Sequence, residues 1–240
     1  MIDWLRPDRQ DPVLEVGGRF LPIEPIVHPR ARRMTLRLAP CGTAVRVSYP
    51  RWGRRGDAIR FAHDRSEWIA AQLAKLPPPT DPLARGDIAF RGRRLVLRHE
   101  ATAPRSGREI AGVLTIGGPA ASLPGRLERW LKTRASELMA EDLVRYCERA
   151  GVDVPLLRLS NARRRWGSCS TKGIVRVNWR LVQAPDNVRR SVVAHEVAHL
   201  VHFDHSAAFH ALLANLYQED LNLADAWLKS HGRTLYSDFG

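Results

Sequence analysis

The sequence predicts an α+β protein, because strand-like and helical patterns occupy different halves of its 240 residues. Short alternating segments dominate up to about residue 117, whereas a long amphipathic pattern begins at about residue 125 and further helical segments follow it. The Gly- and Pro-rich segment 117–125 separates the two halves and is typical of a linker. We therefore expect a small β-rich accessory domain with one helix at 1–120 and a second domain at 121–240.

A β-hairpin is the first element that the sequence predicts. Apolar and polar residues alternate through residues 13–49, most regularly at 34–38 and 44–49. Pro40-Cys41-Gly42 lies between these two segments and supplies turn residues, so the two strands are expected to pair.

One helix and three short strands are expected in the rest of this half. Apolar residues at helical spacing run over about 57–76, and the prolines at 77–79 end the helix. The strands are expected at 87–90, 93–99 and 112–117. No internal repeat is visible in the sequence.

A long amphipathic helix opens the C-terminal half at about 125–150 and ends before Gly151. A second hairpin is expected after it, from strands at 155–162 and 174–180 that are joined through a turn at 167–173.

Three more helices complete the expected fold. Asp186 or Asn187 is a suitable cap for a helix that runs to about residue 202, and Ser206 is a suitable cap for the next one. A last short helix is expected at about 220–230.

The charge is the most informative part of the composition. The chain holds 38 basic and 25 acidic residues, for a net charge of +13, and 34 of the basic residues are arginine. The planar arginine fork can hold two phosphate oxygens at once, so the charge favours an anionic partner, nucleic acid included. The excess of basic residues is 9 in residues 1–120 and 4 in residues 121–240.

Other compositional features argue against several protein classes. There is no run of about 18 apolar residues, and residues 1–7 lack the features of a signal peptide, so we expect a cytoplasmic protein with no membrane partner. The three cysteines, Cys41, Cys147 and Cys169, are widely spaced and contain no C-x-x-C pair. A disulfide framework or an all-cysteine zinc site is therefore not expected.

Five of the nine histidines fall between residues 195 and 210. His195 and His199 are one helical turn apart, so both can bind the same Zn²⁺ ion from one face of a helix. Glu196 lies about 100° round that helix, where its carboxylate can reach a zinc-activated water without binding the metal. The H-E-x-x-H pattern therefore predicts a metal site, and the apolar neighbours Val193 and Val197 place its helix inside the protein.

A catalytic zinc usually has three protein ligands, so one more must come from outside this pair. The candidates within reach are His202, His205, His210, Asp204 and Glu219. Three ligands along one straight helix would be spread over about 10 Å, which argues against His202. His205 lies beyond the expected helix end, where the chain can turn back, and it is the favoured ligand, with Glu219 as the fallback. His202 and His210 are interpreted as structural residues or as neighbours of the ligands.

Several motifs together resemble a known family over most of the chain. The resemblance rests on Trp166-Gly167-Ser168-Cys169-Ser170, on residues 178–181, on His195–His199 and on His205-Ser206, with weaker marks at 32–37 and at Trp68-Ile69. The sequence is similar to the YgjP-like metallopeptidases, which are relatives of the SprT-like zincins. We interpret the 166–170 block as a structural hairpin beside the active site, and Asn178 and the arginines at 163–165 as candidates for substrate contact.

This resemblance implies a zincin-like fold of the minimal gluzincin type, with a small sheet beside the zinc helix. It implies His195, His199 and His205 as zinc ligands and Glu196 as the general base. Two positions depart from the family pattern. His210 stands where the family usually has an aromatic residue, and Asp204 stands where it tends to have Asn, so Asp204 adds a negative charge that could orient His205.

These features predict a zinc-dependent metallopeptidase that cleaves an extended peptide bound along an edge strand. A metal-dependent nucleotide hydrolase acting on phosphoanhydrides is one alternative, which the arginine excess leaves open. A DNA-associated protein with a structural metal is the other. It is disfavoured, because structural zinc sites usually have four protein ligands and do not need a buried general base.

Overall fold

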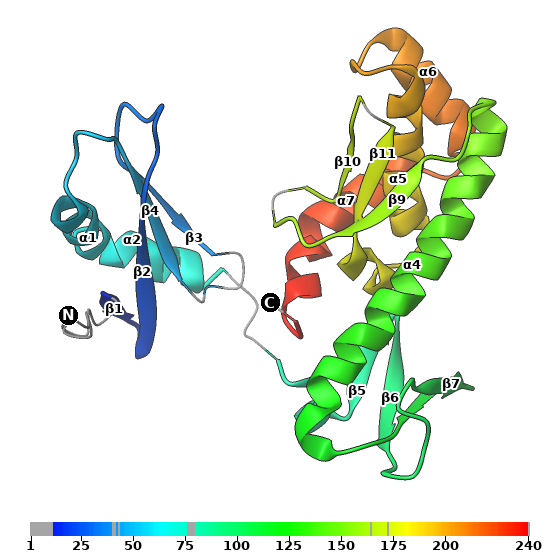
Figure 1. Ribbon diagram of the computed structural model, residues 1–240, viewed down its shortest axis with the longest axis horizontal. Coiled ribbons are helices and arrows are strands. Elements are labelled where there is room, and N and C mark those ends of the chain that lie inside the picture. The colour runs from blue at the N-terminus through cyan, green and yellow to red at the C-terminus, as the bar shows by residue number, and fades with distance from the viewer. Residues whose placement is uncertain are drawn as a thin grey trace, which may run out of the picture. The chain divides into compact units, whose positions relative to one another are not determined.

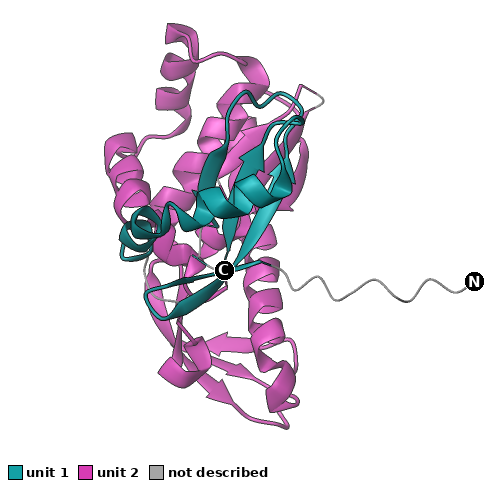
Figure 2. Ribbon diagram, turned by 90° about the vertical axis from the view of Figure 1, so that its left-hand side faces the viewer, with its two compact units in different colours: residues 1–79, 240 teal, residues 80–239 magenta. Residues whose placement is uncertain are grey.

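A computed structural model describes residues 12–39, 42, 44–75, 80–163, 165–171 and 173–239. The chain divides into two compact units, unit 1 up to residue 79 and unit 2 over residues 80–239 (Figure 2). Helices and strands are mixed, as the α+β prediction requires. Among the described residues, no helix has the length and apolar character needed to cross a membrane.

Unit 1 is a four-stranded sheet with two helices packed on one face (Figure 1). Its elements are β1 (Val13–Val16), β2 (Arg19–Val27), β3 (Thr35–Leu38), β4 (Val45–Tyr49), α1 (Arg55–His63) and α2 (Ser66–Leu73). The strand order is β1-β2-β4-β3, with two antiparallel pairs at the edges and a parallel pair, β2 and β4, at the centre. The predicted hairpin is confirmed by β3 and β4. The expected helix at 57–76 is two helices, because Arg65 leaves helical geometry between them.

Unit 2 begins with a short helix and a second four-stranded sheet. The elements are α3 (Pro82–Arg85), β5 (Asp87–Phe90), β6 (Arg93–His99), β7 (Arg108–Ile110) and β8 (Val113–Ile116). The three strands predicted here correspond to β5, β6 and β8, whereas β7 was not expected. The sheet order is β5-β6-β8-β7, again with antiparallel edge pairs and a parallel central pair. The two sheets therefore repeat one topology that is not visible in the sequence.

The segment expected to be a linker is a packed turn. After β8 the chain passes through a 3₁₀ turn, Ala120–Ser122, directly into the long helix α4 (Leu123–Ala150), which covers one face of the β5–β8 sheet. A Cβ atom built at Gly117 would lie 1.7 Å from the Ala103 carbonyl oxygen, so two backbone segments touch there. Since this sheet shares its core with α4, unit 2 begins well before the boundary that the sequence places near residue 120.

A three-stranded sheet follows α4, which ends at Gly151 in the left-handed conformation (φ +67°). Its strands are β9 (Leu156–Ser160), β10 (Gly167–Cys169) and β11 (Ile174–Asn178), in the order β10-β11-β9. The hairpin predicted from 155–162 and 174–180 is wrong, because β9 and β11 run parallel. Strand β10 lies within the expected turn and is the antiparallel partner of β11.

Helix α5 lies at the centre of unit 2. The last elements are a 3₁₀ turn (Trp179–Gln183), α5 (Asp186–Val201), α6 (Ala207–Leu216), α7 (Leu221–His231) and a final 3₁₀ turn (Gly232–Tyr236). Helix α5 packs against α4, β10, α6 and α7, and nine of its residues are buried, Glu196 among them. Ser206 caps α6 as predicted, since its hydroxyl accepts a hydrogen bond from the Phe209 amide. The Asp186 carboxylate does not cap α5, because it pairs with Arg91 and Arg189.

A buried ion pair fixes α5 against α4. The Arg189 Nε atom donates to Asp142 Oδ2 at 2.8 Å, and the two side chains are 2% and 3% exposed. Arg190 approaches the other oxygen of the same carboxylate at 3.5 Å. Charges removed from water in this way tolerate the loss of a partner poorly, so the pair holds the position of α5.

Removal of this buried charge is expected to destabilise unit 2. Asp142→Asn keeps the shape of the side chain but removes the buried charge that faces Arg189 Nε, and Arg189 keeps only its ion pair with Asp186. The free energy of unfolding should therefore fall by about 3–5 kcal/mol. Glu128→Gln is the control, since it breaks the exposed pair with Lys132 on the same helix and should cost less than about 1 kcal/mol. Chemical denaturation measures both, and equal losses would contradict the role given to Asp142.

Candidate metal centre

Three histidines converge at the end of α5. His195 and His199 lie one turn apart on the helix, and His205 comes from the connection to α6. One ligand nitrogen from each ring lies within 4.8 Å of the others, and the Nε2 atoms of His195 and His199 are 3.1 Å apart. Two nitrogens that share a tetrahedral zinc at 2.0–2.1 Å would be separated by about 3.3 Å. The three rings are therefore placed to hold one metal ion.

The turn after α5 returns the chain to the helix face. His202 adopts extended geometry at the C-terminus of α5 (φ −127°, ψ 110°) and so ends the helix. Four residues later, Ser206 caps the start of α6, and the Asp204 carboxylate accepts a weak hydrogen bond from the Ser206 amide at 3.4 Å. Asp204 thus shapes the turn that carries His205, and hydrogen bonding from the Ser206 side chain, followed by that from its amide, lowers the pKa of Asp204.

The His199 ring is oriented by the backbone. Its Nδ1 atom lies 3.0 Å from the His202 carbonyl oxygen, an acceptor that requires the proton on Nδ1. The lone pair of Nε2 then faces His195, as metal binding requires. His202 was expected to be a structural residue or a neighbour of the ligands, and its main-chain carbonyl group, which orients the His199 ring, fills this role.

Phe209 packs against all three imidazoles. Its ring centroid lies 5.1 Å from that of His195, 4.6 Å from that of His199 and 4.8 Å from that of His205. Phe209 is fully buried, so it closes one side of the cluster to water and limits rotation of the rings. No role for Phe209 was predicted from the sequence, although an aromatic residue four positions after His205 on the next helix is a usable signal.

The environment keeps His195 neutral. Burial lowers its pKa to about 4, the nearby rings of His199 and His205 add to this effect, and Asp225 opposes it. A neutral imidazole offers the lone pair that a metal ion binds, so the surroundings favour the binding form of the ring.

Glu196 is buried against strand β10. Glu196 is 5% exposed, and its Oε2 atom has no hydrogen-bond partner among the described residues. Burial raises the pKa of Glu196 to about 7, while the charge of Arg165 and the Cys169 amide lower it. A carboxylate poised in this range can both accept and release a proton near neutral pH.

Gly167 makes room for this carboxylate. A Cβ atom built on Gly167 would lie 2.3 Å from Glu196 Oε1, closer than any real contact. The 166–170 block is therefore more than a structural hairpin, because its glycine lets β10 approach the helix beside the histidines. The sequence contains this glycine between Trp166 and Ser168, but only the packing of β10 against α5 shows that it faces Glu196.

The other candidates lie outside the histidine group. Glu219 faces Arg190, with 3.6 Å between its Oε1 and the Arg190 Nη1 atom. The His210 ring lies 6.4 Å from that of His205 and contributes no atom to the group. Asn178 is fully buried and donates to Ala162 O and Tyr236 Oη, so the suggestion that it contacts substrate is wrong.

Part of the remaining prediction concerns residues outside the described ranges. Arg164 and Cys41 are among them, so the structure describes neither. The other two cysteines, Cys147 and Cys169, are free thiols, as expected. Burial raises the pKa of both, which keeps them protonated.

The comparisons with known proteins agree with this geometry. The family model described as "YgjP-like, metallopeptidase domain" matches residues 32–231, which extend from the β2–β3 connection through α7. No curated protein and no solved structure matches the chain. Because the family match covers most of the sequence and includes all three clustered histidines and Glu196, the chain belongs to the YgjP-like metallopeptidase family.

Proposed function

We propose that this protein is a zinc-dependent peptidase of the zincin type, whose catalytic machinery lies in residues 121–240. The convergence of three imidazole nitrogens beside a buried carboxylate carries this proposal. The residues before 121 supply no side chain to the histidine group, and the helix that carries His195 and His199, with its small sheet, corresponds in this proposal to a minimal gluzincin arrangement.

The donor set suits a catalytic zinc ion. His195, His199 and His205 would hold the ion, and three nitrogen ligands leave a position for water or substrate. When bound, zinc supplies Lewis acidity that acidifies water and polarises a carbonyl group. Glu219 and the side chains of His202 and His210 are not needed as ligands.

Glu196 is the general base in this proposal. Its unpartnered Oε2 can accept a proton from water, and the raised pKa allows the same oxygen to pass that proton to the leaving amine. Gly167 is a positioning residue, because the space above it determines where the carboxylate lies.

The substrate in this proposal is an extended peptide. Strand β10 is the edge strand of its sheet, with β11 on one side and no described strand on the other. An extended chain can add to such an edge through main-chain hydrogen bonds. The added strand would lie close to Glu196, because β10 packs against α5.

Zinc binding is expected to depend on the three clustered histidines. The purified protein should carry about one zinc per chain, and His199→Ala or His205→Ala should weaken binding by orders of magnitude. Glu219→Ala, His202→Ala and His210→Ala should change the affinity by less than about tenfold. Metal analysis with a competing chelator measures this. Full zinc occupancy in the His205 variant would remove it from the ligand set.

Glu196→Gln is expected to separate metal binding from catalysis. The amide keeps the size of the side chain but cannot take a proton, so peptide hydrolysis should fall by at least about 10²-fold while zinc is retained. Unfolded proteins and nucleoside triphosphates serve as substrates, and Glu219→Gln is the control. Loss of zinc would make Glu196 a ligand, and turnover of triphosphates alone would rule out a peptidase.

Gly167→Ala is expected to impair the reaction by displacing Glu196. The added methyl group should lower kcat about tenfold or more, with zinc content and folding unchanged, because it contacts the carboxylate and not the histidines. Gly125→Ala is the control, since nothing lies within 4 Å of its new Cβ atom.

A shorter carboxylate should partly relieve this clash. The combined loss in Gly167→Ala with Glu196→Asp should be smaller than the product of the two single losses. Strictly multiplicative losses would show that Gly167 acts elsewhere.

A further inference from the structure

Unit 1 concentrates arginines at one end of its sheet. Strands β2 and β4 are parallel, so the connections that follow them, 28–34 and 50–54, leave from the same end. The two connections touch there, because the His28 amide donates to the Tyr49 carbonyl oxygen at 2.8 Å. This end carries an arginine cluster that consists of Arg30, Arg32, Arg33, Arg51, Arg54 and Arg55.

The arginine cluster lacks an ion-pair partner among the residues that the structure describes. All six residues are exposed, and none forms an ion pair or side-chain hydrogen bond with a described residue. Neither connection contains an acidic residue. Five of the guanidinium groups belong to the two touching connections, and the sixth belongs to Arg55 at the start of α1. These like charges repel one another, and an anionic partner would neutralise them.

The fold does not require these charges, as the repeated sheet in unit 2 shows. There the Glu100 amide donates to the Ile116 carbonyl oxygen at 3.3 Å, at the position equivalent to the His28–Tyr49 contact. The two corresponding connections, 100–107 and 117–122, hold one arginine, one glutamate and no other charged residue. The same topology is thus built with an almost neutral end.

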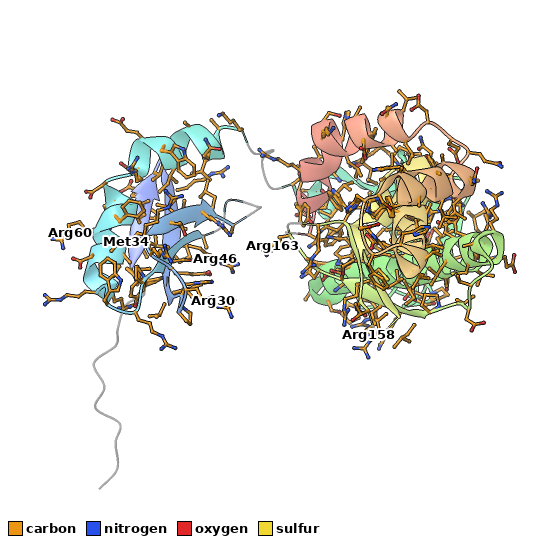
Figure 3. The ribbon with its side chains drawn as sticks, turned by 90° about the horizontal axis from the view of Figure 1, so that it is seen from above. Arg30, Met34, Arg46, Arg60, Arg158 and Arg163 are labelled. Atoms are coloured by element: carbon orange, nitrogen blue, oxygen red, sulfur yellow. The ribbon has the colours of Figure 1, made fainter. Side chains whose placement is uncertain are left out.

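An exposed aromatic ring stands within the cluster. Trp52 lies between Arg51 and Arg54 and is 77% exposed, so the fold does not use its ring as core. Base–aromatic stacking tolerates any base, and a cationic surface with such a platform is the usual arrangement for binding single strands. The arginines of unit 1 do not all lie on the same side. In Figure 3, Arg30 and Arg46 lie on one side of this unit and Arg60 of α1 lies on the opposite side.

We propose that the arginine cluster and Trp52 form a binding site for single-stranded nucleic acid. The guanidinium groups bind successive phosphates, and the Trp52 ring stacks on a base. An acidic protein or an anionic membrane would also satisfy the charge, and both are outcomes of the test below. A single exposed Trp ring within a set of phosphate-binding arginines favours the nucleic-acid strand, because the ring can stack on a base. The site is independent of the peptidase proposal, because it uses no residue of the histidine group.

The test measures the affinity of the full-length chain for a fluorescein-labelled 20-nucleotide DNA strand by anisotropy, at several salt concentrations. Six phosphate contacts predict a slope of log K against log salt near −4, from about −0.7 for each contact on a single strand. Replacement of the Arg51, Arg54 and Arg55 set by Gln should weaken binding at least about tenfold and roughly halve the slope. Replacement of Arg30, Arg32 and Arg33 by Gln should have the same effect on affinity and on the slope.

A matched triple controls for net charge. Arg19, Arg129 and Arg145 are exposed, lack an ion pair with any described residue and lie outside the cluster, so their replacement by Gln should change affinity less than about threefold. Trp52→Ala should weaken binding about fivefold or more at an unchanged slope, and Trp52→Phe should restore most of it. Circular dichroism verifies folding of each variant.

Three results would overturn the proposal. One is an equal loss in the control triple, which would mean general attraction by net charge. The second is an unaffected Trp52→Ala, which would mean a phosphate surface without base contact. The third is equal affinity for polyglutamate or for phosphatidylserine vesicles, which would mean a different class of partner.

Discussion

The Glu196 carboxylate lies between its own helix and strand β10, where burial disfavours its charged form. Helix α5 must therefore combine apolar packing on most sides with one polar face that carries the histidines. Gly167 permits the close approach of β10, Phe209 closes the histidine face, and the buried Arg189–Asp142 pair fixes the helix to α4. A shift of α5 would move Glu196 away from β10, and it would move His195 and His199 away from His205 and Phe209, which lie outside the helix.

The parts of the site that follow from local spacing could be predicted from the sequence. His195 and His199 share a helix face by periodicity alone, and the helix end before His205 and the cap at Ser206 are local signals as well. The space at Gly167 could not be predicted, because it depends on which strand faces α5. A glycine in a short polar segment reads as a turn, and its actual neighbour lies 29 positions away.

Strand pairing explains most of the difference between the expected and the observed fold. Alternation in 155–162 and 174–180 identifies strands but has the same appearance in parallel and antiparallel pairs. The repeated topology of the two sheets is hidden for a related reason. The inward positions Leu14 and Val16 of unit 1 correspond to Ile88 and Phe90 of unit 2, and these pairs share only apolar character. Similar patterns in different residues specify the same sheet without a visible sequence repeat.

The repeat also shows which residues the scaffold requires. Both copies bury the same face and use a tight first hairpin whose two turn residues have positive φ, Gly17-Gly18 in one copy and Arg91-Gly92 in the other. Their surfaces are under no such common constraint. In unit 2 the turn residue Arg91 pairs with Asp186 and so joins the sheet to the start of α5. In unit 1 the arginines at the opposite end of the sheet have no partner among the described residues. In unit 2 the turn arginine therefore helps to hold α5, the helix that carries His195 and His199. In unit 1 the arginines of the cluster face the solvent, where a molecule from outside can neutralise them.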